Sequence, residues 1–526
     1  MTHERNDDPA LPEDRRKAVQ TQGVETLRGG KGVTVNERTW QLELPFATAE
    51  NPDRKREGSG GEAASHLRNA ATRAVPKAKR KDRKTTSATM EEVIHALSEA
   101  FQSVEANKGA PGPDGQSIAE VRAHLDEIIP RLTQSLLDGT YEPGNIRRVW
   151  IPGSGGRGQR GLGIPDVVDR TVHEAVRMVL EPLYEPTFQP QSHGFRPERS
   201  CHTAIAEARQ HVEAGFDVVV DIDLEKFFDG VPRQRLLARL SERVKDARIL
   251  KLIDRMLKAK VVMPDGVIVR TERGVPQGSP LSPLLSNIVL DELDRELSRR
   301  GHRFVRYADD CNVYVRSERA GQRVMASLTQ FIERRLRLRV NQEKSTVARP
   351  EERHFLGFRL RPEPLEGAVE VLLSKRSEER IDGKIRELTP RNWGGSLRTC
   401  ILRLNAYLLG WIGFFGICDG SDTERTLRWL DAHIRRRLRA IQLRHWKRKR
   451  TMARKLIRLG VKPKTAWRSI YGGHKSLWAL SHSPAVDRGL RNAYFAERGL
   501  VSLGERWREK HFPEIVAPAQ LSLALG

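Results

Sequence analysis

Two short apolar runs that end in aspartates constrain this chain most. Residues 218–229 read VVVDIDLEKFFD, and residues 304–315 read FVRYADDCNVYV. β-Branched and aromatic residues favour strands, and the polar break inside the second run favours a hairpin with its acids at the tip. A carboxylate at the mouth of a strand is rigidly held yet open to ions. The sequence therefore predicts that Asp223, Asp309 and Asp310 converge.

Three carboxylates carried by two strands suit a pair of divalent cations. Adjacent acids repel each other and cost stability unless a cation lies between them. Hard oxygen ligands select Mg²⁺, with Mn²⁺ as a substitute. Two such ions about 3.5–4 Å apart polarise an attacking 3′-hydroxyl and stabilise the leaving pyrophosphate during phosphoryl transfer.

Two plainer interpretations of these acids stay open. Asp309 and Asp310 could form an exposed turn while Asp223 caps a helix. Alternatively, Asp221 is the ligand, because it precedes Asp223 by two residues and shares its strand face. The spacing to the paired phenylalanines at 227–228 favours Asp223.

A turn-rich loop lies between the two acidic runs. Residues 273–283 (RGVPQGSPLSP) open a long predicted helix, so their backbone amides can face a nucleotide. Each of the three stretches is a weak signal alone. Their occurrence together, in this order, is far more specific.

Helical and strand patterns are mixed over the first two thirds of the chain. Helices are expected from Met90 and at about 117–137, 166–184, 232–258, 281–300 and 318–338. Strands are expected at 216–222, 267–271, 304–307 and 311–315. This mixture is typical of an α+β core with helices on one side of a small antiparallel sheet. Beyond about residue 375 the pattern is helical and very basic.

The charge of the chain points to a polyanionic partner. Lys and Arg number 92 against 68 Asp and Glu, a formal net charge of +24 over 526 residues. Each phosphate neutralised by such cations releases condensed counterions. Because the charge is spread along most of the chain, a nucleic-acid track fits better than a membrane surface.

Cysteine usage and hydropathy indicate in which cellular compartment the protein is expected. The four cysteines form no CxxC pair, which fits a reducing, cytoplasmic compartment and argues against a zinc knuckle. The most apolar stretch, 404–418, is shorter than the roughly 18 residues that suggest a membrane span. It predicts a buried helix whose glycines allow close packing.

The densest cationic segment lies near the C-terminus. Between residues 425 and 458 the only acid is Asp431, and the cations alternate with apolar residues. Such a helix packs by its apolar stripe and presents charge to a nucleic-acid backbone. A solvated helix is the alternative, but so many like charges repel without an anionic partner. RNA contacts are therefore expected from Arg435, Arg436, Arg437, Lys447, Arg448, Lys449 and Arg450.

In their order, these motifs resemble those of reverse transcriptases, and within them the group II intron-encoded class. Residues 307–310 (YADD) look like the catalytic hairpin, 223–229 like the other metal-ligand motif, and 274–283 like the template and nucleotide-contacting loop. Further resemblances are an N-terminal motif at 107–115, a fingers motif at 193–200, a late palm motif at 341–345 and a primer grip at 355–358. The resemblance covers about 90–375.

The resemblance implies catalytic roles by motif position. Asp223, Asp309 and Asp310 would bind two Mg²⁺ ions, with Leu224 as a further ligand. Lys344 would protonate or neutralise the leaving pyrophosphate; the alternative is a solvated lysine.

The resemblance also implies nucleotide contacts. Phe228 would be a steric gate that crowds a ribose 2′-hydroxyl, with Phe227 beside it, although at least one of the two is expected in the core. Gln277 would contact the incoming nucleotide. Arg157 and Arg160 would hold its triphosphate. The chain departs from the family here, since Gly153 stands where a lysine usually follows Ile-Pro, so the register of this loop stays open.

Residues 376–500 resemble the thumb and maturase domain of the same family, on WIGFF at 411–415, the arginine-rich helices and residues 460–473. This implies binding of the intron RNA that encodes the protein, as a ribonucleoprotein that aids splicing and mobility and also engages a DNA target, a primer and dNTPs. No CxxC or HNH-like cluster follows, which indicates the endonuclease-lacking type.

We therefore expect an α+β right-hand polymerase, with fingers and palm over 89–375, followed by an all-α thumb and maturase domain over 376–500. A disordered basic arm (1–88) and a C-terminal tail (501–526) would flank them. The expected activity is RNA-directed DNA polymerisation, with no membrane association. Two alternatives are an RNA-binding splicing factor with a dead polymerase fold and a domesticated reverse transcriptase in phage defence.

Overall fold

The computed structural model describes residues 88–152, 159–270, 273–275, 277–363, 367–473 and 476–513. The chain divides into two compact units, residues 1–75 and 76–526, and all described residues belong to the second. The predictions for the basic arm and for Arg157 fall outside the described residues.

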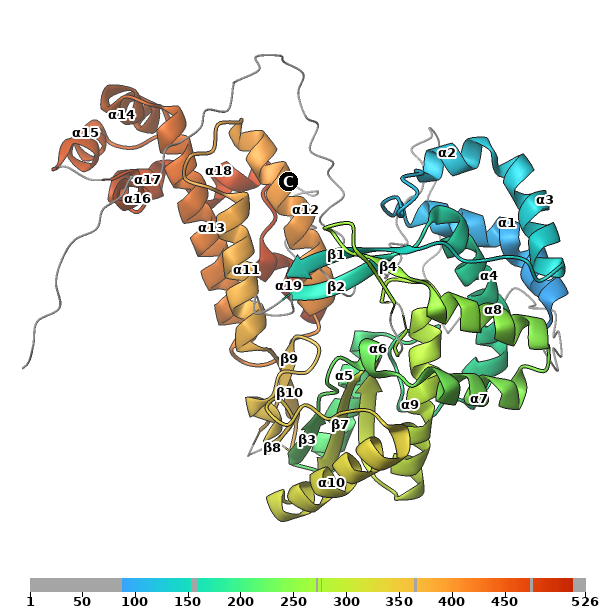
Figure 1. Ribbon diagram of the computed structural model, residues 1–526. Helices are drawn as coiled ribbons and strands as arrows, with labels where there is room; N and C mark the ends of the chain where they lie inside the picture. Colours follow the sequence, from blue (N-terminus) through green and yellow to red (C-terminus); the bar gives the residue numbers. More distant parts are fainter. Residues whose placement is uncertain are drawn as a thin grey trace, which may run out of the picture. The chain divides into compact units, whose positions relative to one another are not determined.

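The described chain begins with a helical layer (Figure 1). It consists of α1 (Met90–Ala106), α2 (Ile118–Ala123), α3 (Leu125–Leu137) and α4 (Val167–Tyr184). A capping box between Thr89 and Glu92 starts α1, whose apolar stripe packs on α4. The single helix expected over 117–137 is divided at His124.

A first four-stranded sheet has the order β2-β1-β4-β5. Its strands are β1 (Ile146–Pro152), β2 (Gln159–Ile164), β4 (Val261–Val262) and β5 (Ile268–Val269). β1 pairs antiparallel with β2 and parallel with β4. The sequence pattern predicted only the last of these strands.

A second four-stranded sheet carries the acidic runs, in the order β6-β7-β3-β8 with antiparallel neighbours. Its strands are β3 (Val218–Ile222), β6 (Arg303–Tyr307), β7 (Asp310–Val315) and β8 (Thr346–Ala348). The helices that contact it are α5 (Cys201–Glu213), α9 (Ser282–Arg299) and α10 (Glu318–Phe331).

These helices cover both faces of the second sheet, which corrects the expectation of a one-sided layer. α10 packs closely on one face, where a Cβ at Gly321 would lie 3.5 Å from methyls of Val218 and Val220. On the other face, His211 of α5 lies 5.3 Å from the ring of Tyr314. Side chains alternate between faces along each strand, so Val220 and Tyr314 face opposite ways.

The segment between the two acidic strands is helical. It contains α6 (Phe227–Gly230), α7 (Arg233–Arg243) and α8 (Ala247–Lys258). The single helix expected over 232–258 is divided into α7 and α8. α7 ends at Arg243, and a new helix begins after Asp246, whose side chain accepts a hydrogen bond from the Arg248 amide. Short helical turns occur at η1 (Glu185–Thr187), η2 (Ile332–Leu336) and η3 (Pro350–Glu352).

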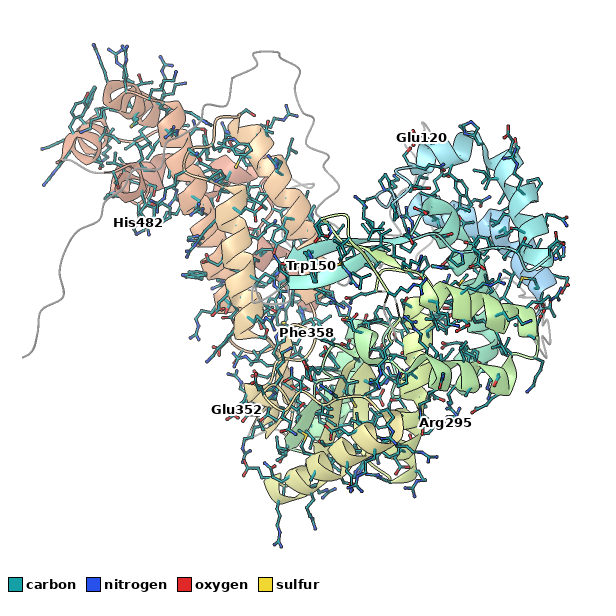
Figure 2. The ribbon with its side chains drawn as sticks, viewed as in Figure 1. Glu120, Trp150, Arg295, Glu352, Phe358 and His482 are labelled. Carbon is teal, nitrogen blue, oxygen red and sulfur yellow. The ribbon has the colours of Figure 1, made fainter. Side chains whose placement is uncertain are left out.

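The antiparallel hairpin of β9 (Phe358–Pro362) and β10 (Val369–Leu373) leads into an all-helical region. Phe358, labelled in Figure 2, lies 5.5 Å from the ring of Phe414 and 5.2 Å from that of Phe415. The helices are α11 (Lys375–Leu388), α12 (Leu397–Phe415), α13 (Thr423–His445), α14 (Lys449–Arg458), α15 (Pro463–Tyr471), α16 (Leu477–Leu480), α17 (Pro484–Gly489), α18 (Asn492–Ala496) and α19 (Leu503–His511).

Two predictions for this region need correction. α12 is only half buried, because Leu402 and Leu409 are exposed. A Cβ at Gly410 would meet open space, so close packing does not require glycine at this position. α19 lies within the expected tail yet packs on α13, where Asp431 accepts a hydrogen bond from the Leu503 amide. Among the helices that the structure describes, none is both long and apolar enough to cross a membrane.

Candidate active site

The acids of the two runs meet at one end of the second sheet. β3 and β7 pair antiparallel up to Ile222 opposite Cys311, so the next pair in register is Asp223 and Asp310. Directly opposed residues share a face, with Cα atoms about 4.5–5.5 Å apart. Asp309 occupies the hairpin turn immediately before Asp310. The backbone register therefore brings the three acids to one end of the sheet, and metal binding by them stays a prediction.

Residues 341–345 hold the backbone of Asp223 in place through hydrogen bonds. The Asp223 amide donates to Ser345 Oγ at 3.0 Å, and the Asn341 amide donates to the Asp223 carbonyl at 2.9 Å. Lys344, between them, places Nζ 3.6 Å from Asp223 Oδ2 while its side chain stays largely exposed. The predicted late palm motif thus supplies one cation beside this carboxylate.

The carboxylates perturb each other electrostatically. Burial raises the pKa of Asp310 to about 7, with further raising by Asp309, Asp221 and Asp223. The pKa of Asp223 is also raised, first by burial and then by Asp309 and Asp221, although Lys344 opposes this. A group of acids that raise one another's pKa is stabilised by a bound cation.

The donor set fits hard divalent cations, although the described side chains do not form a closed cage. Carboxylate oxygens are the ligands that Mg²⁺ and Mn²⁺ prefer. Across the described ranges, however, no group of three or more His, Cys, Asp or Glu side chains is arranged to hold a metal ion. The register brings the acids to one edge, and a cation would have to draw their oxygens together. Leu224, the further ligand implied by resemblance, has an apolar, buried side chain, so only its backbone carbonyl is available.

Asp221 is occupied by a different partner. Arg353 donates to Asp221 Oδ2 through Nε at 3.1 Å and also through its second terminal nitrogen. Asp221 is held through two nitrogens of Arg353, whereas Asp223 has only the longer 3.6 Å contact with the largely exposed Lys344, so Asp223 is the freer carboxylate. The structure therefore favours Asp223 of the two.

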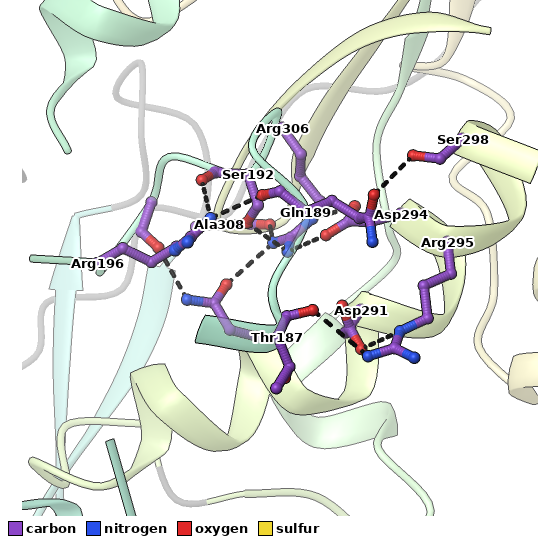
Figure 3. A network of polar contacts seen from close by, with 12 residues as sticks. Thr187, Gln189, Ser192, Arg196, Asp291, Asp294, Arg295, Ser298, Arg306 and Ala308 are labelled. Atoms are coloured by element: carbon purple, nitrogen blue, oxygen red, sulfur yellow. Dashed lines mark hydrogen bonds and ion pairs between the residues drawn. The ribbon is translucent and has the colours of Figure 1, made fainter. Parts of the chain in front are cut away.

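The tip of the acidic hairpin is a tight turn that the buried Arg306 side chain holds in place. Ala308 adopts φ 56°, a left-handed conformation that is unusual for a residue with a side chain. The fully buried guanidinium of Arg306 donates to the Ala308 carbonyl at 2.7 Å. Its other hydrogen bonds reach Asp294 at 2.7 and 2.6 Å, Asn287 at 3.0 Å and Ser192 at 2.7 Å (Figure 3).

The predicted fingers motif packs against this same tip. A Cβ at Gly194 would lie 3.0 Å from the Cα of Ala308 and closer still to its amide nitrogen, so only glycine fits. Asn287 donates to the Gly194 carbonyl at 2.8 Å, and the His193 amide donates to the Arg306 carbonyl at 2.8 Å. α9 and the motif at 193–200 therefore fix the position of the paired acids together.

The loop at 273–283 links α6, which follows β3, to the first sheet. The Val275 amide donates to the Phe228 carbonyl at 2.7 Å, and the Gly163 amide of β2 donates to the Gln277 carbonyl at 2.6 Å. Gly274, at φ 98°, passes so close to Phe228 that a Cβ would lie 2.8 Å from its carbonyl oxygen. Gln277 and Phe228 are thus parts of one region connected by backbone hydrogen bonds.

A buried histidine supports this loop. His173 Nδ1 lies 2.8 Å from Ser279 Oγ, and complete burial lowers the pKa of His173 to about 4. Nε2 of His173 has no hydrogen-bond partner in the described part of the chain. A neutral imidazole is therefore favoured at this position.

The two phenylalanines have different environments. Phe227 is buried in the main core at 3% exposure, whereas Phe228 is only partly buried, and their rings meet edge to face at 5.4 Å. Phe227 is the core member of the pair, and Phe228 is the one able to contact a ligand. Arg160 is exposed on β2, three residues from Gly163, and so lies on the strand that the loop touches.

The C-terminal cations differ in burial, and the prediction that Arg437 contacts RNA needs correction. Its side chain is 8% exposed and donates to Thr389 Oγ1 at 2.5 Å and to the Thr389 carbonyl at 2.7 Å, so it joins α13 to the end of α11. Arg436 lies over the Trp478 ring at 4.2 Å. Lys447, Arg448 and Arg450 are exposed; Arg435 and Lys449 are partly buried.

Sequence reasoning missed the residues that hold the hairpin. Arg306, Asp294 and Asn287 were read only as parts of a strand and a helix. The one available signal was the unusual presence of a charged residue in the middle of an apolar strand, since charges are rarely buried unless paired.

Comparisons with known proteins agree with the motif order. The family described as "Reverse transcriptase (RNA-dependent DNA polymerase)" matches residues 152–360, and the family described as "Group II intron, maturase-specific domain" matches residues 379–459. These spans contain both acidic runs and the whole of the densest cationic segment, residues 425–458.

Curated relatives match over long stretches of the chain. Over 327 residues the chain is 30% identical to "Group II intron-encoded protein LtrA" of Lactococcus lactis subsp. cremoris, covering 50% of this chain and 54% of that protein. The chain thus spans about half the length of that relative. It is 32% identical over 352 residues to "Protein YkfC" of Escherichia coli (strain K12), covering 59% of this chain and 89% of YkfC.

Similarity to solved structures is low. A chain of the "Partial Cas6-RT-Cas1--Cas2 complex" aligns at 23% identity and a TM-score of 0.32, covering 47% of this chain and 43% of that one. A likeness at this level carries no argument about function.

Proposed function

Because the chain belongs to the group II intron reverse transcriptase and maturase family, we propose that it is an active RNA-directed DNA polymerase that also binds its intron RNA. The observation that carries the polymerase proposal is the register that sets Asp223 opposite Asp310, with Asp309 adjacent. The right-hand arrangement of fingers, palm and thumb, with bounds near 375 and 500, is part of this proposal.

Asp223, Asp309 and Asp310, with the Leu224 carbonyl, would hold two Mg²⁺ ions, for which Mn²⁺ could substitute. When bound, such ions activate the primer 3′-hydroxyl and stabilise the charge of the leaving pyrophosphate. Lys344 supports this chemistry, because its ammonium lies 3.6 Å from Asp223 and can neutralise or protonate the pyrophosphate.

Substrate selection would rest on the connected loop region. The partly buried ring of Phe228 would crowd a 2′-hydroxyl and favour deoxynucleotides. Gln277, joined by its backbone to β2, would contact the incoming nucleotide, and Arg160 on that strand would reach its phosphates. Arg157 would act beside it. A pocket that excludes one hydroxyl by shape needs a rigid wall, which Gly274 and Val275 provide behind Phe228.

The maturase proposal rests on the charge of the C-terminal helices. No Asp or Glu occurs between Asp431 and Asp487, and the cations at 447, 448 and 450 point to solvent. Structured RNA is recognised largely through shape, phosphates and 2′-hydroxyls, which a broad cationic surface can contact. Splicing assistance, mobility into a DNA target and a cytoplasmic, nucleoid-associated location follow from this proposal.

Primer extension tests the polymerase proposal directly. The purified chain should extend a DNA primer on an RNA template with Mg²⁺ and dNTPs, and Asp309→Asn should abolish synthesis without changing the melting temperature by more than a few degrees. If wild-type protein binds RNA but extends no primer under any divalent cation, the chain is an RNA-binding protein with an inactive polymerase fold.

A further inference from the structure

The outward face of α15 carries two aromatic rings that the polymerase site does not use. Trp467 and Tyr471 are 37% and 49% exposed, and their ring centroids lie 5.5 Å apart. The opposite face of the same helix is buried through Ala466 and Ile470. The helix is therefore anchored by its small apolar side, while its large aromatic side chains face solvent.

Helical spacing places cations on the same outward face. Lys464 precedes Trp467 by three residues, Arg468 precedes Tyr471 by three, and both cations are exposed. Lys449, at the start of α14, lies 5.7 Å from the centre of the Tyr471 ring. The face thus combines ring surfaces with positive charge on both sides.

Acidic side chains are sparse around these cations, because Asp487 of α17, which packs on α14 and α15, is already paired with Arg439. No Asp or Glu occurs in the sequence from 432 to 486, and no ion pair forms at the described cations of α14 and α15. The exposed cations of α14, of α15 and of the turn between them are Arg450, Arg454, Lys455, Arg458, Lys462, Lys464 and Arg468. A ligand must therefore supply negative charge along its length and flat apolar faces together.

We propose that the outward face of α15, with Trp467 and Tyr471 at its centre and the cations of α14 and α15 around them, binds an unpaired stretch of RNA. Bases stack on the two rings, and the exposed cations contact the flanking phosphates. In a paired helix the base faces are covered by their neighbours, so only unpaired nucleotides can use the rings. This inference rests on the proposed RNA-binding function and specifies the RNA feature recognised; the rings lie within residues 460–473, which resemble the maturase domain.

Competition between surfaces must be removed before the site is tested. The full-length protein is first loaded with an excess of unlabelled RNA-template and DNA-primer duplex, which occupies the polymerase site. Fluorescence anisotropy then measures binding of two labelled RNAs of equal length, one unstructured and one fully paired, over a range of salt concentrations. The variants are Trp467→Ala/Tyr471→Ala, Trp467→Phe/Tyr471→Phe and Lys464→Ala/Arg468→Ala.

Removing both rings should weaken binding of the unstructured RNA about tenfold or more, with an unchanged salt slope. Binding of the paired RNA should change less than about twofold, and the phenylalanine variant should restore the lost affinity. The cation variant should weaken both RNAs and lower the salt slope by about 1–2. Trp429→Ala, which removes another exposed tryptophan on α13, serves as the matched control and should bind like wild type.

The inference is overturned if the ring variant binds unstructured RNA within twofold of wild type, or loses affinity equally for both RNAs. It is also overturned if the rings matter only for binding to anionic phosphatidylserine vesicles. Wild-type protein that binds neither RNA, loaded or unloaded, would contradict the proposed RNA-binding function as well. Failure of the ring site alone leaves wild-type RNA binding intact, so the two failures are distinguishable.

Discussion

Arg306 donates a hydrogen bond of 2.7 Å to the carbonyl oxygen of Ala308, the residue that precedes the paired aspartates. The same guanidinium is bound on its other edge by both oxygens of Asp294. Both side chains of this ion pair are fully buried. The turn that presents Asp309 and Asp310 is therefore anchored to α9 through a single arginine.

Arg306→Lys should uncouple the hairpin tip from that anchor. Lysine keeps the charge but lacks the planar set of donors that contacts Ala308, Asp294, Asn287 and Ser192 at once. Since small misplacements of reacting groups can cost up to about 100-fold in rate, we expect kcat for primer extension to fall about 10- to 100-fold with little change in KM for dNTP.

The matched control is Arg295→Lys on α9, the helix that carries Asp294; the Arg295 side chain is 48% exposed and pairs with the buried Asp291. It should extend primers like wild type. Steady-state kinetics at a temperature where circular dichroism shows both variants folded would check this, and equal kcat in the two variants would count against the anchoring role.

Gly194→Ala should displace the same turn without altering any charge. The new Cβ would overlap the backbone of Ala308, so either the fingers motif or the hairpin must move. We expect primer extension to fall at least about tenfold. Gly383→Ala, at a position in α11 where a Cβ meets nothing, should instead stabilise the protein by about 0.5–1 kcal/mol and leave the rate unchanged. Equal rates for both variants would contradict the packing argument.

Phe227 and Phe228 should respond differently to truncation. Phe228→Val opens space beside the incoming sugar, and we expect the preference for dNTP over rNTP, measured as a ratio of kcat/KM values, to fall about tenfold or more. Phe227→Ala removes a buried core ring and should lower the free energy of unfolding by about 3–5 kcal/mol without a comparable change in that ratio. If Phe227 rather than Phe228 controls rNTP incorporation, the assignment of the gate is wrong.

His173 should make the protein sensitive to acid. Its folded pKa is about 4, below the ordinary value of 6.5, so between these values the unfolded state binds the proton more readily. Stability from this residue is therefore complete above pH 6.5 and is lost as pH falls toward 4, by roughly 3 kcal/mol in total.

His173→Gln should flatten that part of the pH dependence. Urea unfolding of wild type and variant at pH 7.5, 6, 5 and 4.5 would measure the difference. Parallel curves for the two proteins would show that His173 does not titrate between the folded and unfolded states as its burial requires.

The sequence was sufficient for the elements that carry local signals. Alternation and β-propensity located β3, β6 and β7, and the short break at 308–309 located the turn. The same logic placed Asp223, Asp309 and Asp310 together, because strands that end in acids tend to present them at one edge. Phe227 and Phe228 could be recognised as a pair, but only the fold separates the buried ring from the accessible one.

The supporting contacts were beyond local patterns. Ser192 lies far from Arg306 in sequence, and Asp294, although only twelve residues away, is on the preceding helix, so both partnerships depend on how α9 packs on the sheet. Arg437 had the composition of an RNA contact, yet the packing of α13 on α11 turned it inward toward Thr389. The strands β1 and β2 were missed because they are rich in arginine and glycine, and tertiary pairing overrides their weak propensity.

The most direct test compares Asp223→Asn with Asp221→Asn in primer extension on an RNA template. Both changes remove one charge near the end of β3, but only Asp223 is next in register with Asp310, while Asp221 is engaged by Arg353. We predict that Asp223→Asn loses at least about a thousandfold in rate, on the order of 4 kcal/mol of transition-state stabilisation, and that Asp221→Asn retains measurable synthesis. Undiminished synthesis by Asp223→Asn would contradict the placement of the catalytic acids.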